Sequence, residues 1–151
     1  MTTTTTLAEL PSLKGHELGT SSWVEVTQDR VNLFADATGD HQWIHIDVER
    51  AKAESPFGGP IAHGYLTLSL IIPMYSEVLT VSDAKMGVNY GLNKVRFPAP
   101  VPVGAKVRLT ATLKDVEEVA GGLQVTIAGV IEAEGGSKPV CIAEPVFRVY
   151  G

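Results

Sequence analysis

The spacing of apolar residues changes along the chain, and each change marks a different kind of element. Val31, Phe34 and Ala35 recur at intervals of three and four residues, which is typical of one face of an α-helix. Thr27 is a good N-cap for this helix, and Gly39 is a natural stop because glycine enters the left-handed conformation at little cost. The pattern therefore predicts a short amphipathic helix over residues 28–37.

The next segments are loops and a second short helix, and then the chain turns strongly apolar. We expect a loop at residues 40–46, a helix over residues 48–53 capped by Asp47, and a proline- and glycine-rich loop at residues 55–60. From residue 61 to about residue 78, apolar side chains fall on every side of the helical wheel, which indicates a buried helix. Pro73 should kink it, because proline has no N–H to donate.

Beyond residue 82 the period becomes two, which is the period of β-strands. Strands are predicted at residues 85–90, 92–97, 107–114, 123–131 and 140–150, with a shorter one at residues 23–26. Gly121-Gly122 and Gly135-Gly136-Ser137 offer turns between the last three. A buried helix followed by antiparallel strands predicts an α+β fold, in which a curved antiparallel sheet wraps around a long central helix.

Length and composition fit one globular domain over residues 1–151. The chain has 151 residues, of which 44% are hydrophobic and 19% charged. A net charge of −5 argues against a nucleic-acid binder, which would show a basic face. No stretch approaches the ~18 apolar residues of a membrane span, so no membrane partner is expected.

The first ten residues and the single cysteine bear on processing and location. Met1 is followed by five threonines, without the basic and apolar regions of a signal peptide, so residues 1–10 are interpreted as a flexible tail. Cys141 has no partner for an internal disulfide, which is compatible with a reducing compartment and a cytoplasmic location.

The strongest candidates for chemistry are Asp40 and His45, five positions apart in one predicted loop. A carboxylate and an imidazole placed in this way can reach one water and act as a general acid/base pair. The alternatives are a turn-forming aspartate after Gly39 and a structural histidine. The pairing on one loop, with His63 and Gly64 to follow, favours chemistry.

Two further interpretations concern the same region. Asp40, His41, His45 and His63 include enough ligand types for zinc, although no His-Glu-x-x-His pattern is present. Gly64 would stand at the start of the buried helix, where unpaired backbone N–H groups can stabilise an oxyanion. The alternative for Gly64 is close packing of the helix start.

These residues form a recognisable motif. Phe34-Ala-x-Ala-Thr-Gly-Asp40-x-x-x-Ile-His45, followed by Ile61-Ala62-His63-Gly64, resembles the MaoC-like family of (R)-specific enoyl-CoA hydratases. The similarity is greatest to small mycobacterial-type and nodulation-protein-N-like members, and it extends from about residue 15 to the end of the chain. The run at residues 93–101 also resembles part of the family's later sheet.

The resemblance implies a hot-dog fold, a homodimer, and reversible syn addition of water to trans-2-enoyl-CoA, giving (R)-3-hydroxyacyl-CoA. It implies catalytic roles for Asp40 and His45, and a backbone donor at Gly64 for the thioester carbonyl. No cofactor or metal is expected, with the coenzyme A thioester as substrate. We expect the residues that contact the substrate to include Gln42, Trp43, His63 and Tyr65.

One departure and two rival functions remain open. The family usually has Asn-Pro where this chain has Gln42-Trp43, which leaves the shape of the acyl pocket and the chain-length preference open. A thioesterase of the same fold is the alternative enzyme. A non-catalytic acyl-CoA-binding or dimerisation module is the alternative outside catalysis.

Overall fold

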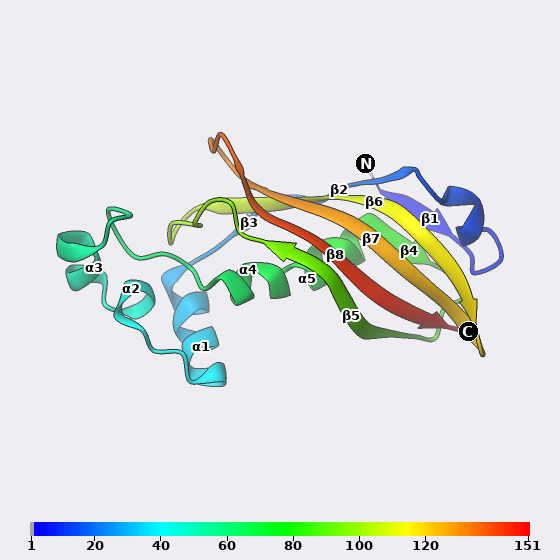
Figure 1. Cartoon of the computed structure of the whole chain (residues 1–151), viewed down its shortest axis with the longest axis horizontal. Coiled ribbons are helices and arrows are strands. Elements are labelled where there is room, and N and C mark those ends of the chain that lie inside the picture. The colour runs from blue at the N-terminus through cyan, green and yellow to red at the C-terminus, as the bar shows by residue number, and fades with distance from the viewer. Residues whose placement is uncertain (1) are drawn as a thin grey trace.

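The computed structural model describes residues 2–151, and its largest element is a curved antiparallel sheet (Figure 1). Four long strands supply most of it, in the order β6-β7-β8-β5, and the short β2 and β3 pair with β6. Alternation of buried and half-buried residues along β6 and β7 confirms the period of two. The bounds are β2 Glu17–Thr20, β3 Val24–Glu25, β5 Met86–Arg96, β6 Lys106–Val119, β7 Gly122–Ala133 and β8 Pro139–Tyr150.

The central helix lies along one face of this sheet in two pieces, α4 Gly64–Ser69 and α5 Ile71–Val78. The break at Leu70 comes three residues before Pro73, whose missing N–H cannot bond to the carbonyl four residues earlier. The expected kink is therefore confirmed. The expected start at residue 61 is wrong, because Ile61 forms a β-bridge with Pro102 and only Gly64 begins the helix.

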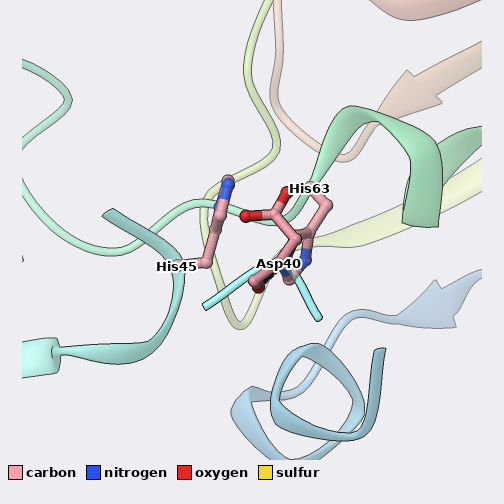
Figure 2. Close-up of side chains that lie close together, drawn as sticks. All are labelled: Asp40, His45 and His63. Atoms are coloured by element: carbon pink, nitrogen blue, oxygen red, sulfur yellow. Dashed lines mark hydrogen bonds between the residues drawn. The ribbon is translucent and has the colours of Figure 1, made fainter. Parts of the chain in front are cut away.

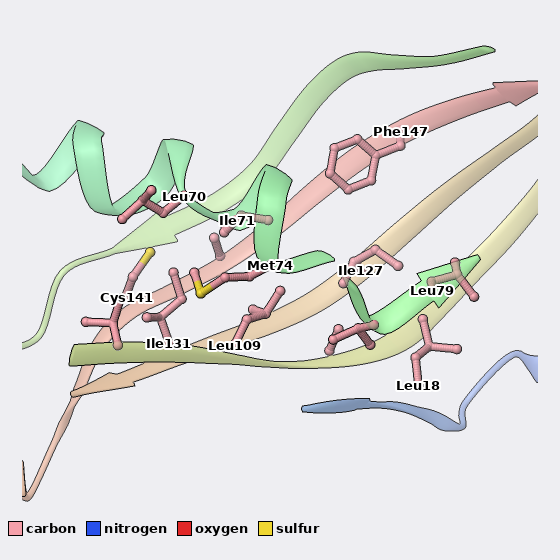
Figure 3. Packing of buried hydrophobic residues seen from close by; sticks show 14 of the residues in the cluster. Leu18, Leu70, Ile71, Met74, Leu79, Leu109, Ile127, Ile131, Cys141 and Phe147 are labelled. Carbon is pink, nitrogen blue, oxygen red and sulfur yellow. The ribbon is translucent and has the colours of Figure 1, made fainter. Parts of the chain in front are cut away.

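The core lies between this helix and the sheet (Figure 3). Ile71 and Met74 from α5 pack within one cluster with Leu109, Ile127 and Ile131 from the strands, and all five are 0–2% exposed. The helix is not buried all round, however, since Tyr65 is 70% and Ile72 is 41% exposed. The reason is geometric: one curved sheet covers only one side of a helix, so the opposite stripe stays uncovered.

The N-terminal segment is ordered into secondary structure, so the prediction of a flexible tail over residues 1–10 is wrong for residues 2–10. Strand β1, Thr3–Thr5, pairs in parallel with β4, Leu79–Val81, immediately after α5. A short 3-10 helix, η1 Leu10–Leu13, follows, and Leu10 is fully buried. Pairing with a strand more than seventy residues away is a long-range contact that the local sequence does not reveal.

Three short helices gather beyond one end of the sheet (Figure 1). Helix α1, Gln28–Thr38, and helix α3, Val48–Glu54, confirm the two short helices that the sequence predicted. A one-turn helix, α2 Trp43–Ile46, occupies part of the expected loop. Within residues 2–151, no helix is long and apolar enough to cross a membrane. This helical group carries Asp40 and His45 to the start of α4.

Candidate active site

The loop that carries Asp40 is fixed at both ends by backbone chemistry. The Thr27 side chain accepts a hydrogen bond from the Arg30 amide at 3.1 Å, which caps the start of α1. At the other end Gly39 has a φ of 81°, a left-handed conformation that glycine adopts without strain, and its amide bonds to the Ala35 carbonyl. The chain leaves the helix there, and Asp40 follows with its side chain exposed.

His45 lies in α2, is 6% exposed, and has its ring orientation fixed. Its Nδ1 lies 2.7 Å from the Ile61 carbonyl oxygen, which can only accept, so Nδ1 carries the proton and Nε2 keeps a lone pair. The Gln28 amide donates to the backbone carbonyl of His45 at 2.8 Å and ties α2 to α1. Burial lowers the pKa of His45 from its ordinary value of 6.5, while the Ile61 carbonyl opposes that shift. The imidazole is therefore a neutral acceptor near neutral pH.

His63 lies immediately before α4 and contacts both Asp40 and His45. Its Nε2 lies 3.0 Å from the backbone carbonyl oxygen of Asp40, and its ring stacks on that of His45 with centroids 3.9 Å apart. The Phe34 ring lies against it as well, at 4.9 Å. Two segments, residues 34–45 and the start of α4, are thus joined through one buried imidazole.

The three side chains converge on one place (Figure 2). One side-chain nitrogen or oxygen from each of Asp40, His45 and His63 lies within 4.8 Å of those of the other two. They border a pocket of about 500 Å³, whose lining also includes Phe34, Thr38, Gly64, Tyr65 and Phe97. A carboxylate and a neutral imidazole at this spacing can hold one water between them as hydrogen-bond acceptors.

Gly64 is the first residue of α4, so its N–H belongs to the helical turn that lacks intrahelical acceptors. The Phe97 ring lies only 3.2–3.3 Å from the point where a Cβ on Gly64 would stand. The start of α4 is therefore closely packed, and a side chain at position 64 would require the Phe97 ring to shift slightly. The same absence of a side chain leaves the backbone accessible from the pocket, which Gly64 lines.

Not every residue expected at the site lines this pocket. Among residues 2–151, the residues that line the pocket do not include Gln42 and Trp43. The backbone N–H of Gln42 donates to a carboxylate oxygen of Asp40 at 3.4 Å, and the Arg50 guanidinium lies over the Trp43 ring at 4.2 Å. Tyr65 lines the pocket and is largely exposed.

Three pocket residues, Phe34, Thr38 and Phe97, were missed as site residues. Phe34 belongs to the motif, but its spacing from Val31 and Ala35 indicates only the apolar face of a helix. Phe34 and Thr38 are four residues apart in α1 and therefore share one face of the helix, which is a signal that could have placed them together. Phe97 follows β5, and no signal in the sequence connects it with Gly64.

The arrangement does not favour a metal ion as it stands. His41 lies apart from the other ligands and pairs with Asp36 at 3.0 Å. The lone pairs of His45 and His63 lie in their ring planes, and these planes are stacked only 26° from parallel. Both rings cannot point at one ion unless one of them rotates away from its backbone carbonyl.

Comparison with known proteins places this site in context. The sequence profile described as MaoC like domain matches residues 10–135. The chain is 52% identical over 149 residues to 3-hydroxyacyl-thioester dehydratase Z of Mycobacterium tuberculosis, covering 98% of each protein. It is 47% identical over 139 residues to Nodulation protein N of Rhizobium leguminosarum bv. viciae, covering 91% of this chain and 86% of that one.

Solved structures support the fold. A protein described as the monoamine oxidase regulatory protein from Archaeoglobus fulgius superposes with a TM-score of 0.78 and 25% identity, over 100% of this chain and 99% of that one. The (R)-hydratase from A. caviae involved in PHA biosynthesis superposes with a TM-score of 0.72 and 23% identity, over 89% and 94% of the two chains. The expected hot-dog fold, a sheet wrapped around a central helix, is confirmed.

Proposed function

Because this chain belongs to the MaoC-like domain family and is a dehydratase of that family, we propose that it is an (R)-specific enoyl-CoA hydratase. The reaction is reversible syn addition of water to a trans-2-enoyl-CoA, giving an (R)-3-hydroxyacyl-CoA. The observation that carries the proposal is the convergence of Asp40 and the free Nε2 of His45 on one pocket. The substrate is the coenzyme A thioester itself, and the reaction uses no cofactor or metal.

In the proposed mechanism, one water donates a hydrogen bond to the Asp40 carboxylate and another to Nε2 of His45. The water oxygen attacks C3 while Asp40 accepts its proton. The protonated Asp40 then delivers that proton to C2 from the same side, while Nε2 of His45 accepts a hydrogen bond from the hydroxyl that forms at C3, so both parts of the water add to one face. Positioned proton-transfer groups of this kind contribute about 10²–10⁴-fold each.

The negative charge that develops on the thioester oxygen needs a donor as well. Gly64 is proposed to supply it through its backbone N–H at the start of α4. A fixed donor of this type contributes about 10²–10³-fold in kcat. Exposed Tyr65, at the pocket, is proposed to contact the substrate, while Gln42 and Trp43 hold the loop that presents Asp40 and His45.

The homodimer is a further part of the proposal. Helix α4–α5 leaves a stripe exposed that includes Tyr65, Ser69 and Ile72, and β5 forms one edge of the six-stranded sheet. An edge strand offers unpaired backbone N–H and C=O groups, and exposed apolar residues next to it favour association. A second copy would cover the stripe and pair along β5.

The test is a spectrophotometric hydration assay with crotonyl-CoA on the wild type, Asp40→Asn and His45→Gln. Both variants should fold, because Asp40 is exposed and glutamine keeps a donor near Ile61, yet each should lose at least about 10²-fold in rate. Near-normal rates in both would end the assignment. Release of free thiol would instead identify a thioesterase, and loss of activity after treatment with a chelator would identify a metal site.

A further inference from the structure

His63 occupies an unusual position between the two proposed catalytic residues. It is only 2% exposed, although it borders the pocket. Its ring stacks on His45 at 3.9 Å with an interplanar angle of 26°, and the Phe34 ring lies at 4.9 Å and 51°. A side chain with so little free surface offers little contact area to a substrate, but it contacts the other site residues closely.

The hydrogen bond of His63 reaches Asp40, the second of the two proposed catalytic residues. Nε2 lies 3.0 Å from the Asp40 backbone carbonyl, which is an acceptor, so Nε2 donates and Nδ1 has a lone pair. The bond joins residues 23 positions apart. It connects the loop after α1 to the start of α4, and therefore sets where the Asp40 carboxylate stands relative to the Gly64 amide.

The second ring nitrogen of His63, Nδ1, lowers the stability of the folded protein. Nδ1 of His63 is buried and has no hydrogen-bond partner among residues 2–151. A buried polar atom without a partner destabilises the folded state, and such atoms in native proteins call for a functional explanation. A residue with the same ring shape but without this nitrogen would avoid the penalty.

We propose that His63 is a positioning residue that fixes both proposed catalytic groups at once. Its N–H holds the Asp40 loop, and its ring face holds the imidazole of His45 in the plane that aims Nε2 into the pocket. This inference rests on the proposed hydration reaction, and it replaces substrate binding as the role of His63.

Two variants separate the two contacts. His63→Gln keeps an amide donor that reaches the Asp40 carbonyl but removes the aromatic face. His63→Phe keeps the aromatic face and removes the donor together with the orphaned nitrogen. Small displacements of reacting groups lower the rate of the chemical step strongly. In each variant, kcat for crotonyl-CoA should therefore fall about 10-fold or more, with KM within about 3-fold of wild type. His63→Phe should unfold at the same or a higher temperature than wild type.

A spectroscopic readout judges the stack independently of turnover. In ¹H NMR spectra, the ring protons of His45 should keep their wild-type ring-current shift in His63→Phe and lose it in His63→Gln. The matched control is His41→Gln, which changes an exposed histidine paired with Asp36 and should leave kcat, KM and the His45 signals unchanged.

The outcomes distinguish the possible errors. A higher KM with unchanged kcat would show that His63 contacts substrate, and unchanged kcat in both variants would show that positioning does not matter; either result overturns the inference. If the wild type hydrates no enoyl-CoA, the proposed function fails. The inference then falls too if the His45 signals are the same in both variants.

Discussion

At the scale of the residue, the direction of one hydrogen bond decides what His45 can do. Because Nδ1 donates to the Ile61 carbonyl, Nε2 is left as an acceptor, as the proposed water between His45 and Asp40 requires. A carbonyl on the backbone bridge between Ile61 and Pro102 is a rigid partner for this purpose. The sequence contained both residues but not this bond, since it depends on how residue 61 pairs with residue 102.

The pH dependence of hydration should report the state of His45. Burial lowers its pKa below 6.5, so the neutral acceptor persists to a lower pH than in an unburied histidine. We expect kcat/KM to be flat near neutral pH and to fall only below about pH 6.5, the ordinary histidine value. A pH series with crotonyl-CoA measures this, and an acid limb centred above that value would contradict it.

The free energy of unfolding should also depend on the protonation of His45, and it should fall on acidification, as kcat/KM does. On acidification the unfolded chain binds the proton of His45 first, because its pKa there is the higher one, so stability falls as pH drops below about 6.5. Urea unfolding of His45→Gln should lack this part of the pH dependence. Above that pH both states are neutral at this position, and His45 adds no further dependence.

At the scale of the element, the sequence predicted local order well and long-range partners poorly. Helices α1 and α3 and the alternation of β6 and β7 follow from caps and periods that lie within each segment. The pairing of β1 with β4 and the contact of Phe97 with Gly64 depend on the register of distant segments. The grouping of the candidate site could be predicted to the extent that Asp40 and His45 share one short stretch, with His63 and Gly64 at the next helix start.

The Gln42-Trp43 departure has a structural explanation at the start of α2. Trp43 is the first residue of that helix, where an N–H has no intrahelical acceptor and proline is favoured. Gln42 has φ −59° and ψ 139°, an extended conformation that a residue before proline can adopt. The Trp43 indole instead packs against the Arg50 guanidinium at 4.2 Å. This side-chain contact restrains the start of α2 in place of the backbone restraint that a proline ring would give.

Trp43→Pro should therefore fold and keep its activity. It removes the cation–π contact, a loss of about 0.5–1 kcal/mol, and gains about 0.4–1 kcal/mol by restricting the unfolded chain. We expect the free energy of unfolding in urea to change by less than about 1 kcal/mol. Ile44→Pro is the matched control: it would force Trp43 out of the helical conformation and displace His45, so it should lose both stability and hydration. A loss of hydration in a folded Trp43→Pro would instead assign the indole to the substrate.

At the scale of the whole molecule, the fold is asymmetric about its central helix. One side of α4–α5 packs into the sheet through residues such as Ile71 and Met74, and the other side carries exposed Tyr65 and Ile72. The apolar residues on every side of this helix predicted that it is buried all round, but a single chain buries only one side of it. A second copy is the simplest cover, because its own α4–α5 stripe and β5 edge present the same unsatisfied surface.

The mass in solution tests this directly. Light scattering behind size-exclusion chromatography should give about twice the 16.1 kDa of one chain. Ile72→Glu places a charge on the helix stripe and should shift the mass toward the monomer, since an unpaired carboxylate resists burial at an interface. Val130→Glu is the control: Val130 is 40% exposed against 41% for Ile72, but it lies in β7 within the sheet, so the dimer should persist. A wild-type monomer, or equal disruption by both variants, would show that the stripe is not the contact and that the helix keeps its open side in solution.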